Sequence, residues 1–171
     1  MTSSKLLNTA QDLLFPRRCP ICDRPVRPFT SLICDTCGAV PQALSQEECL
    51  AVIGEASHPF VRGTGAFAYR SLAPSIYRFK FEGREEYADW YGGRMALAME
   101  RVLAPPKETL LVPVPIAAGR MRERGYNQST LLARKIAART GLSLSETSLF
   151  RVRETPPLRL LSPEERRKKL K

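Results

Sequence analysis

The chain has 171 residues, enough for one ordinary domain or for a small domain with an attachment. Its hydrophobic fraction of 43% is typical of a globular protein, and no long polar tract indicates wholesale disorder. A formal net charge of +10 points to anionic partners, namely nucleic acid, phosphorylated metabolites or an acidic membrane face. No apolar run is long enough to predict a transmembrane helix.

The N-terminal segment is predicted to form a short amphipathic helix that ends at Phe15-Pro16. Its apolar face consists of Leu6, Leu7, Ala10, Leu13 and Leu14. Polar residues interrupt the segment and no small-residue cleavage site follows, so it lacks the pattern of a signal peptide. We expect a cytoplasmic chain whose N-terminal helix packs on its own domain, with membrane docking as the alternative. Its cysteines are expected to be reduced unless a metal binds them.

Four cysteines form the pairs C-P-I-C and C-D-T-C, with eleven residues between the pairs. They are Cys19, Cys22, Cys34 and Cys37. Two such turns supply the tetrahedral sulfur shell that zinc prefers, and with no histidine nearby the site is predicted to be closed and structural. A redox motif does not need two matched pairs, and disulfides do not fit the compartment. The segment between the pairs is predicted to be a hairpin, and Gly38 to have a positive φ.

The N-terminal helix and the zinc ribbon are predicted to span residues 1–40. Residues 41–63 have mixed composition and are predicted to be a linker to the main domain at 64–171. Cys49 has no partner in the cysteine pattern and is predicted to be a small buried hydrophobic residue. His58 is predicted to be a loop residue, and no role is assigned to it.

The first half of the main domain is predicted to be mostly helical. Weak alternation over 65–69 predicts an edge strand. Residues 75–81 are predicted to form a short helix that ends before Gly83, and residues 84–104 a longer helix stopped by Pro105-Pro106. The aromatic residues at helical spacing in the longer helix are Tyr87, Trp90 and Tyr91. That spacing favours a place in the core over a base-stacking platform.

The clearest strand is predicted over 109–115, where a near-continuous apolar run is typical of a parallel strand covered on both faces. The clearest helix is predicted over 127–140, with Leu132 and Ile136 on its buried face and Gly141 as its C-terminal cap. Strand, loop and helix make half of a βαβ unit. Ligands of open parallel sheets bind beyond the C-terminal ends of the strands.

The loop between this strand and this helix, residues 116–125, has the composition of an anion site. Its arginines are Arg120, Arg122 and Arg124, which offer charge-assisted contacts. The helix that follows offers free backbone N–H groups and the positive end of its dipole, and Gly125 allows close backbone approach. The alternative is that the arginines cover the sheet edge and pair with Glu123. These features together favour a bound anion, which we expect to be a phosphate.

Motifs along nearly the whole chain resemble, in the same order, those of the ComF family of amidophosphoribosyltransferase-like competence proteins. They are LLFPRRCPIC, CDTC, KFEG, VPVP, RMRERGYNQSTLLAR and RVRETPP followed by LSPEERRKKL. A lone CxxC pair is weak support, but all of these motifs in this order are specific. The resemblance implies an α/β protein: a small N-terminal four-cysteine zinc ribbon followed by an incomplete type I phosphoribosyltransferase-like domain, Rossmann-like and with a parallel sheet.

By this resemblance the domain would bind phosphoribosyl pyrophosphate with magnesium, a nucleophile would attack the anomeric carbon, and pyrophosphate would leave. The residues that the resemblance assigns to the ligand are Lys80, Arg120, Arg124, Gly125, Tyr126 and Asn127. Arg124 would be the main guanidinium and Lys80 a second cation, while residues 125–127 would offer backbone N–H groups to the pyrophosphate. The basic segment 151–171 would be the mobile hood that closes over the substrate.

The chain also departs from the family pattern. Leu158 stands where the family's T-P-P-Q has glutamine, and Lys169 where its R-R-x-N has asparagine. The family's acidic pair for the ribose and its T-T-G loop for the 5′-phosphate are not among the 171 residues. We therefore expect a C-terminally truncated homologue linked to DNA uptake, a phosphoribosyltransferase by resemblance, with its catalytic half missing and no catalytic residue assigned. The alternatives are a zinc-dependent module that binds single-stranded DNA or the competence helicase machinery, and a non-functional fragment.

Overall fold

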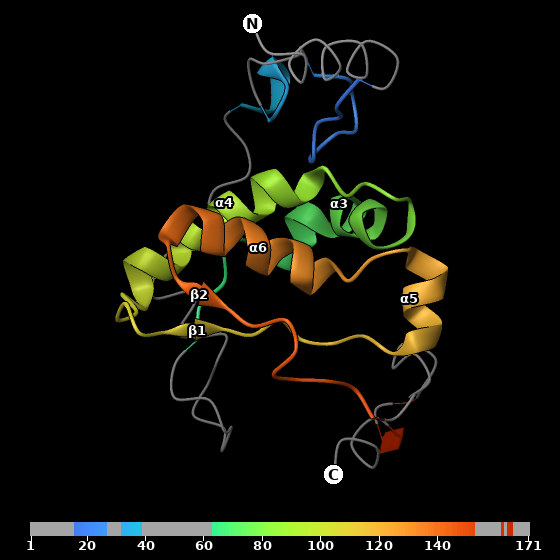
Figure 1. Cartoon of the computed structure of the whole chain (residues 1–171). Coiled ribbons are helices and arrows are strands. Elements are labelled where there is room, and N and C mark those ends of the chain that lie inside the picture. The colour runs from blue at the N-terminus through green and yellow to red at the C-terminus, as the bar shows by residue number, and fades with distance from the viewer. Residues whose placement is uncertain (1–15, 27–31, 39–62, 153–161, 163, 166–171) are drawn as a thin grey trace, which may run out of the picture.

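The structure is a computed structural model that describes residues 16–26, 32–38, 63–152, 162 and 164–165 (Figure 1). The predicted N-terminal helix, Cys49, His58 and most of the predicted linker and hood lie outside the described residues. None of the helices in the described ranges is long and apolar enough to span a membrane.

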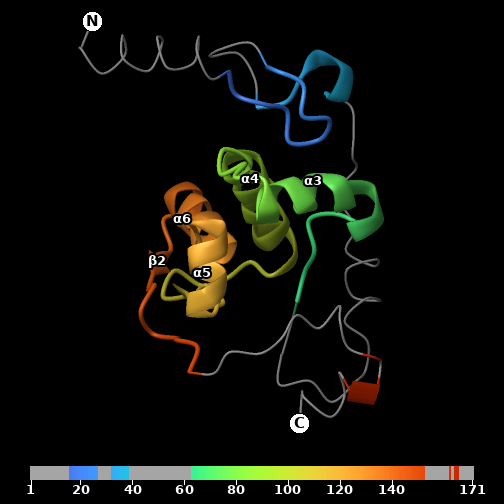
Figure 2. The same ribbon diagram turned by 90° about the vertical axis from the view of Figure 1, so that its right-hand side faces the viewer.

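A cysteine-rich module precedes a helical body with a small parallel sheet. The elements are η1 (Asp35–Cys37), α3 (Tyr69–Phe81), α4 (Tyr87–Val102), β1 (Leu110–Leu111), α5 (Ala118–Arg124), α6 (Gln128–Thr140) and β2 (Ser143–Leu144). Two perpendicular views show the spatial order of these parts (Figure 1, Figure 2). The cysteine-rich module lies beside α3 and α4, α6 comes next, and the strands lie beyond α6. Helices combined with a parallel sheet are consistent with the predicted α/β class.

The segment that leads into α3 differs from the prediction. Residues 65–69 form no strand, because Phe67 stacks on Trp90 of α4 with the ring centroids 5.0 Å apart, and the helix begins at the end of this segment. α3 begins earlier than predicted and includes Pro74. Proline is common at helix starts and rare inside helices, so the sequence pattern indicated a start just after it. The predicted end before Gly83 is confirmed.

The aromatic residues of α4 lie in the centre of the core, as predicted. The buried cluster consists of Leu72, Phe79, Tyr87, Ala88, Trp90, Tyr91 and Tyr126. Tyr87 is 0% exposed and Trp90 is 5% exposed, so neither ring is available for stacking on a base. α4 begins later than predicted because residues 84–86 form a turn, in which the Tyr87 backbone N–H donates to the Arg84 carbonyl at 3.2 Å.

The predicted strand is present but short. β1 pairs in parallel with β2, with Leu110 opposite Ser143. The paired part covers only two residues of the predicted 109–115, because β2 is itself two residues long. Val112 and Val114 are 39% and 65% exposed. The prediction of a strand covered on both faces is therefore wrong for these residues in the described part of the chain.

The predicted α6 helix is confirmed with both of its caps. The Asn127 side-chain oxygen accepts a hydrogen bond from the Ser129 backbone N–H at 3.0 Å. At the other end Gly141 has φ 73°, and its N–H donates to the Ala137 carbonyl at 2.8 Å. On the buried face Ile136 is 8% exposed, so the helix presents the expected apolar side to the core.

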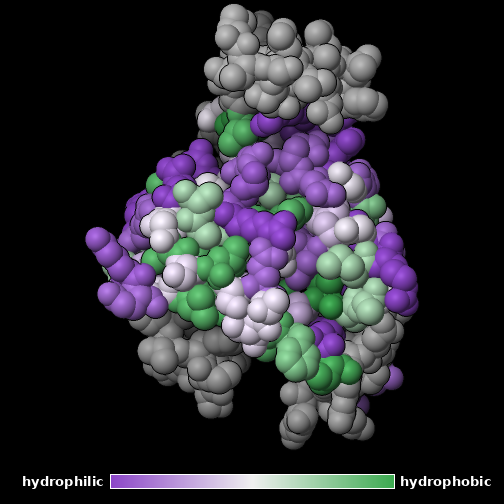
Figure 3. Space-filling view, in the orientation of Figure 1, coloured by the Kyte–Doolittle hydropathy of each residue, from purple (hydrophilic) through white to green (hydrophobic). Residues whose placement is uncertain are grey.

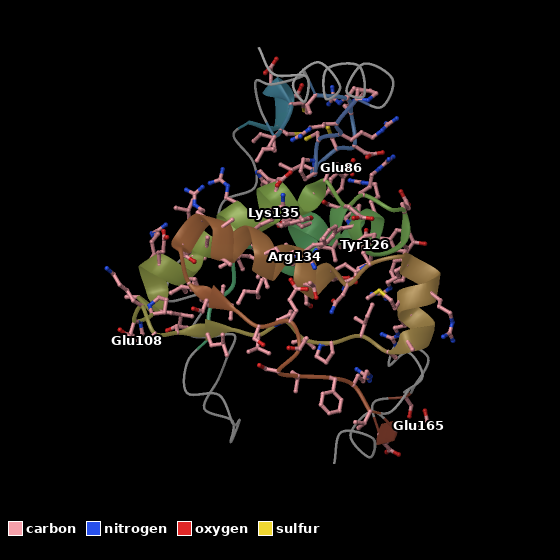
Figure 4. The ribbon with its side chains drawn as sticks, viewed as in Figure 1. Glu86, Glu108, Tyr126, Arg134, Lys135 and Glu165 are labelled. Atoms are coloured by element: carbon pink, nitrogen blue, oxygen red, sulfur yellow. The ribbon has the colours of Figure 1, made fainter. Side chains whose placement is uncertain are left out.

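α6 packs across α4 at a point where α4 has glycine. A Cβ added to Gly92 would lie 2.4 Å from the Lys135 Cβ of α6, far closer than two carbon atoms approach. Lys135 also forms an ion pair with Asp89 of α4. Figure 4 labels Lys135 on α6. The missing side chain of Gly92 therefore sets how closely the two helices pack.

Gly92→Ala should lower the free energy of unfolding by about 1–3 kcal/mol, because the added methyl group overpacks the helix crossing. The matched control is Gly93→Ala, where the added Cβ would meet Arg139 only at 4.0 Å. That control should be neutral or stabilising by up to about 1 kcal/mol, since alanine favours a helix. Urea unfolding followed by the fluorescence of the single tryptophan measures both. Equal losses of unfolding free energy in the two variants would contradict this packing.

Candidate functional site

The four cysteines converge on one centre. The sulfur atoms of Cys19, Cys22, Cys34 and Cys37 all lie within 4.8 Å of one another. Cys22 Sγ and Cys34 Sγ are 3.6 Å apart, and all four thiols are free. A tetrahedral zinc with Zn–S bonds of about 2.3 Å separates its sulfur ligands by about 3.8 Å. The spacing therefore fits a four-thiolate metal site.

The thiols influence one another strongly. Burial raises the pKa of Cys22, but hydrogen bonds from the Arg24 backbone and from the other three thiols outweigh it and lower that pKa to about 6. Burial and the hydrogen bonds with Cys22 and Cys34 raise the pKa of Cys37 to about 12. Clustered thiolates repel one another, so the full set of negative charges needs a cation among them. This chemistry is compatible with a structural metal.

The turns around the cysteines differ from the prediction in one detail. Gly38 has φ −56°, so the expected positive φ there is wrong. The second cysteine pair instead runs into the short helix η1, and the Gly38 N–H donates to the Asp35 carbonyl at 3.4 Å. The positive φ belongs to Asp23, at 62°, directly after the first pair. Asp23 closes the first turn by donating its N–H to the Cys19 carbonyl at 2.9 Å.

Asp23 fastens the cysteine module to the helical body. Its carboxylate accepts two hydrogen bonds from the Arg84 guanidinium, at 3.0 and 3.2 Å, and one from the Tyr87 hydroxyl at 2.5 Å. Burial alone would raise the pKa of Asp23, but the hydrogen bonds from Tyr87 and Arg84, with the charges of Arg84 and Arg18, hold it below its usual value. The contact is a bidentate, charge-assisted pair, which is among the stronger polar interactions.

Two backbone carbonyls of the first cysteine turn also bond to α3. Ser75 Oγ donates to the Pro20 carbonyl and also bonds the Tyr91 hydroxyl at 2.5 Å. Arg78 Nη2 donates to the Ile21 carbonyl at 2.8 Å. The Ile21 side chain packs on the aromatic core. The first cysteine turn is thus bonded to both α3 and α4.

The residues predicted to bind an anion meet where the C-terminal end of α3 contacts the α5–α6 turn. The Tyr126 hydroxyl donates to the Phe79 carbonyl, and the residue is 7% exposed. Figure 4 labels Tyr126. Burial and the charge of Glu85 raise the pKa of Tyr126 to about 12, so this hydroxyl stays protonated. Gln128 Nε2 lies 3.5 Å from the Lys80 carbonyl. These contacts position the predicted turn against α3.

The predicted cations Lys80, Arg124 and Arg120 are neighbours in space. Burial and the charge of Arg124 lower the pKa of Lys80, and burial and the charge of Arg120 lower the pKa of Arg124. The Arg124 guanidinium lies 4.7 Å from the centroid of the Phe81 ring, and its Nη1 donates to Gln128 Oε1 at 3.0 Å. The structure therefore brings the cations together and holds Arg124 in a fixed orientation.

The segment predicted as a loop over 116–125 contains the helix α5, so that part of the prediction is wrong. α5 ends at Gly125, which has φ 80° and whose N–H donates to the Met121 carbonyl at 2.9 Å. The Gly125 N–H is thus engaged. Within the described residues no hydrogen bond satisfies the backbone N–H groups of Tyr126 and Asn127. Asn127 Nδ2 bonds the Val114 carbonyl at 3.1 Å, which fixes the turn to the segment after β1.

Two cavities flank this region. One, of about 720 Å³, is lined by Gly125, Tyr126 and Asn127 together with residues that follow β2. The other, of about 510 Å³, is lined by Lys80 and Gln128 and otherwise mostly by apolar residues of α3, α4 and α6. The predicted ligand residues are thus divided: the turn faces the larger cavity and Lys80 the smaller one.

Comparison with known proteins agrees with this arrangement of motifs. The chain is 31% identical over 162 residues to the DNA utilization protein YhgH of Salmonella typhimurium, a match that covers 90% of this chain and 68% of that protein. It is 28% identical over 125 residues to the competence protein ComFC of Bacillus subtilis, covering 67% of this chain and 49% of ComFC. The chain belongs to the ComF family. No family model and no solved structure matches it.

Inspection of the ComF-family motifs assigned no role to Asp23, Arg84 and Gln128. Asp23 directly follows C-P-I-C, Arg84 follows K-F-E-G, and Gln128 lies within the motif RMRERGYNQSTLLAR, directly after Asn127. The available signal was an acidic residue, Asp23, next to the first cysteine pair and a basic residue, Arg84, next to another motif. Their pairing depends on a contact between residues far apart in sequence, which spacing alone does not indicate.

Asp23→Asn should lower the free energy of unfolding of the zinc-loaded chain by about 1–3 kcal/mol, because two charge-assisted bonds to Arg84 are lost. Asparagine keeps the size of the side chain and tolerates the positive φ. The control is Asp35→Asn in the same module, since Asp35 is exposed and forms no ion pair within the described ranges. Urea unfolding compares the two. Wild-type stability of Asp23→Asn would rule out this fastening role.

Proposed function

We propose that this chain binds a pyrophosphate-bearing sugar phosphate of the phosphoribosyl pyrophosphate kind at the α5–α6 turn, and that it serves DNA uptake or utilization. One observation supports the binding proposal: Arg124, held by Phe81 and Gln128, lies near enough to Lys80 and Arg120 for like charges to lower the pKa of Lys80 and of Arg124. Like charges that folding brings together are destabilising unless an anion lies between or beside them.

The competing explanation for the arginines finds little support. If they only covered a sheet edge, Glu123 would be their natural partner. Among the described residues, Glu123 forms no ion pair with Arg120, Arg122 or Arg124, although its charge offsets part of the lowering of the Arg124 pKa. Arg124 is instead held by Phe81 and Gln128. A fixed guanidinium with remaining donor groups is suited to a phosphate oxygen.

The turn contributes its own donors. α6 has 13 residues, and its N-terminal end lies where Asn127 caps the helix. The backbone N–H groups of Tyr126 and Asn127 and the positive end of the helix dipole favour an anion there. A divalent cation such as magnesium would accompany a pyrophosphate ligand, because it neutralises the negative charge of the ligand that the basic side chains of the protein leave uncompensated.

The role in DNA handling rests on the relatives. One is described as a DNA utilization protein and another as a competence protein. The net charge of +10 suits a protein that works near nucleic acid. We infer that zinc is the metal of the four cysteines, because four thiolates and no histidine form the closed site that structural zinc prefers. The proposal concerns ligand binding, and no catalytic step is derived from the residues present.

Arg124→Gln should weaken the binding of inorganic pyrophosphate with magnesium about tenfold or more, because a charge-assisted contact is lost. Lys80→Gln, which removes a second cation of the group, should also weaken it. The control is Arg122→Gln, which removes the same charge from an exposed position on the same helix. Isothermal titration calorimetry of the zinc-loaded variants measures all three. Equal affinity in the three variants, or no heat of binding to the wild-type chain, would overturn the proposal.

A further inference from the structure

The four cysteines of the metal site differ in their exposure to solvent. Cys19 is 0% exposed and Cys37 is 9% exposed, and both belong to a small buried cluster with Val26. Cys22 and Cys34 are only partly buried and pack at the edge of this cluster. Each C-x-x-C pair therefore contributes one buried thiol and one partly exposed thiol to the site.

The two partly exposed thiols are neighbours in space although they belong to different pairs. Cys22 Sγ and Cys34 Sγ lie 3.6 Å apart, while the residues are twelve positions apart in the sequence. A disulfide bond needs its two sulfur atoms to approach to about 2.0 Å. A short movement of these two side chains would therefore bring their sulfur atoms to bonding distance.

We infer that Cys22 and Cys34 form an oxidation site, at which a peroxide converts the two thiols into a disulfide and releases the metal. The first sulfur attacks hydrogen peroxide, the O–O bond breaks, and a sulfenic acid and one water molecule form. The second sulfur attacks the sulfenic sulfur, the S–S bond forms and a second water molecule leaves. The two sulfur atoms together lose two electrons, which the peroxide gains. Two protons, from the thiols or from solvent when a metal is bound, complete the water molecules.

The cross-link would take over one task of the metal, because it joins the two cysteine pairs. Only Cys19 and Cys37 would remain as thiol ligands, and a structural zinc needs four ligands, so the metal would leave. The contacts that dock the first turn use no sulfur atom: Arg78 bonds the Ile21 carbonyl, and Arg84 bonds Asp23. Oxidation should therefore leave this docking in place.

The surroundings of the cysteine module suit a small polar oxidant. Figure 3 shows mainly hydrophilic surface on the upper part of the described body, near the module, and hydrophobic surface lower on the same face. Arg24 and Asp35, each directly beside a cysteine turn, are exposed. Redox-sensitive cysteines are typically accessible to solvent and have a second thiol close by. Cys22 and Cys34 meet both conditions, whereas Cys19 and Cys37 are buried.

The test treats the zinc-loaded wild-type chain with hydrogen peroxide and then locates the disulfide by mass spectrometry without reduction. After denaturation, a protease that cuts before aspartate separates Cys22 from Cys34 at Asp23. We expect fragments 12–22 and 23–34 to stay linked, and tandem fragmentation to place the bond at Cys22 rather than Cys19. A chromogenic chelator should detect one zinc released per chain, and dithiothreitol should restore zinc binding.

The control variant is Cys49→Ser, a change at the cysteine outside the two pairs, which should leave the cross-link and the zinc release unchanged. A Cys22–Cys34 disulfide in both proteins supports the inference. A disulfide within one C-x-x-C pair, or one that includes a buried cysteine, would overturn it. Sulfinic acid without a disulfide, or thiols that survive peroxide concentrations at which free cysteine is oxidised, would also overturn it.

The result does not depend on the proposed sugar-phosphate site, since none of the residues of that site takes part in the oxidation. If the purified chain holds no zinc, the proposal of zinc as the metal fails. The same disulfide mapping of the reduced, metal-free chain then still decides whether Cys22 and Cys34 are the oxidation site.

Discussion

The docking of the first cysteine turn on α3 and α4 is the interaction on which the rest of the described structure depends. A turn that presents its sulfur atoms to a metal leaves backbone carbonyls pointing the other way. Here Ser75 and Arg78 bond two of these carbonyls, and Asp23 pairs with Arg84. Buried polar groups need such partners, because an unsatisfied one costs about 1–3 kcal/mol. The metal site and the aromatic core therefore share one boundary.

α3 extends this constraint to the opposite side of the body. Its middle bonds the cysteine turn, and its last residues bond the α5–α6 turn through the Phe79 carbonyl and the stacking of Arg124 on Phe81. The proposed anion site is thus built on a helix whose position the metal module fixes. A binding turn supported by a rigid element keeps its donors in place at a lower entropic cost. We regard α3 as the physical link between the cysteine module and the proposed ligand site.

Elements with strong local signals were predictable from the sequence. α6 has an Asn cap, an apolar face and a Gly cap, and its bounds agree with the prediction to one residue. The four cysteines converge as their spacing indicates. Elements that depend on tertiary contacts were not predictable: the start of α3 around Pro74, the helix α5 in place of a loop, and the positive φ at Asp23 instead of Gly38. In each case packing or long-range pairing outweighed the local preference.

Native mass spectrometry of the purified chain, before and after chelation of its metal and titrated with phosphoribosyl pyrophosphate and magnesium, tests the link between the two sites most directly. We expect one zinc per chain and one bound ligand, and we expect the ligand adduct to disappear when the zinc is removed, since the metal supplies folding energy to the module that fixes α3. A zinc-free chain that binds the ligand as well as the loaded chain, or a zinc-loaded chain that does not bind it, would contradict this link.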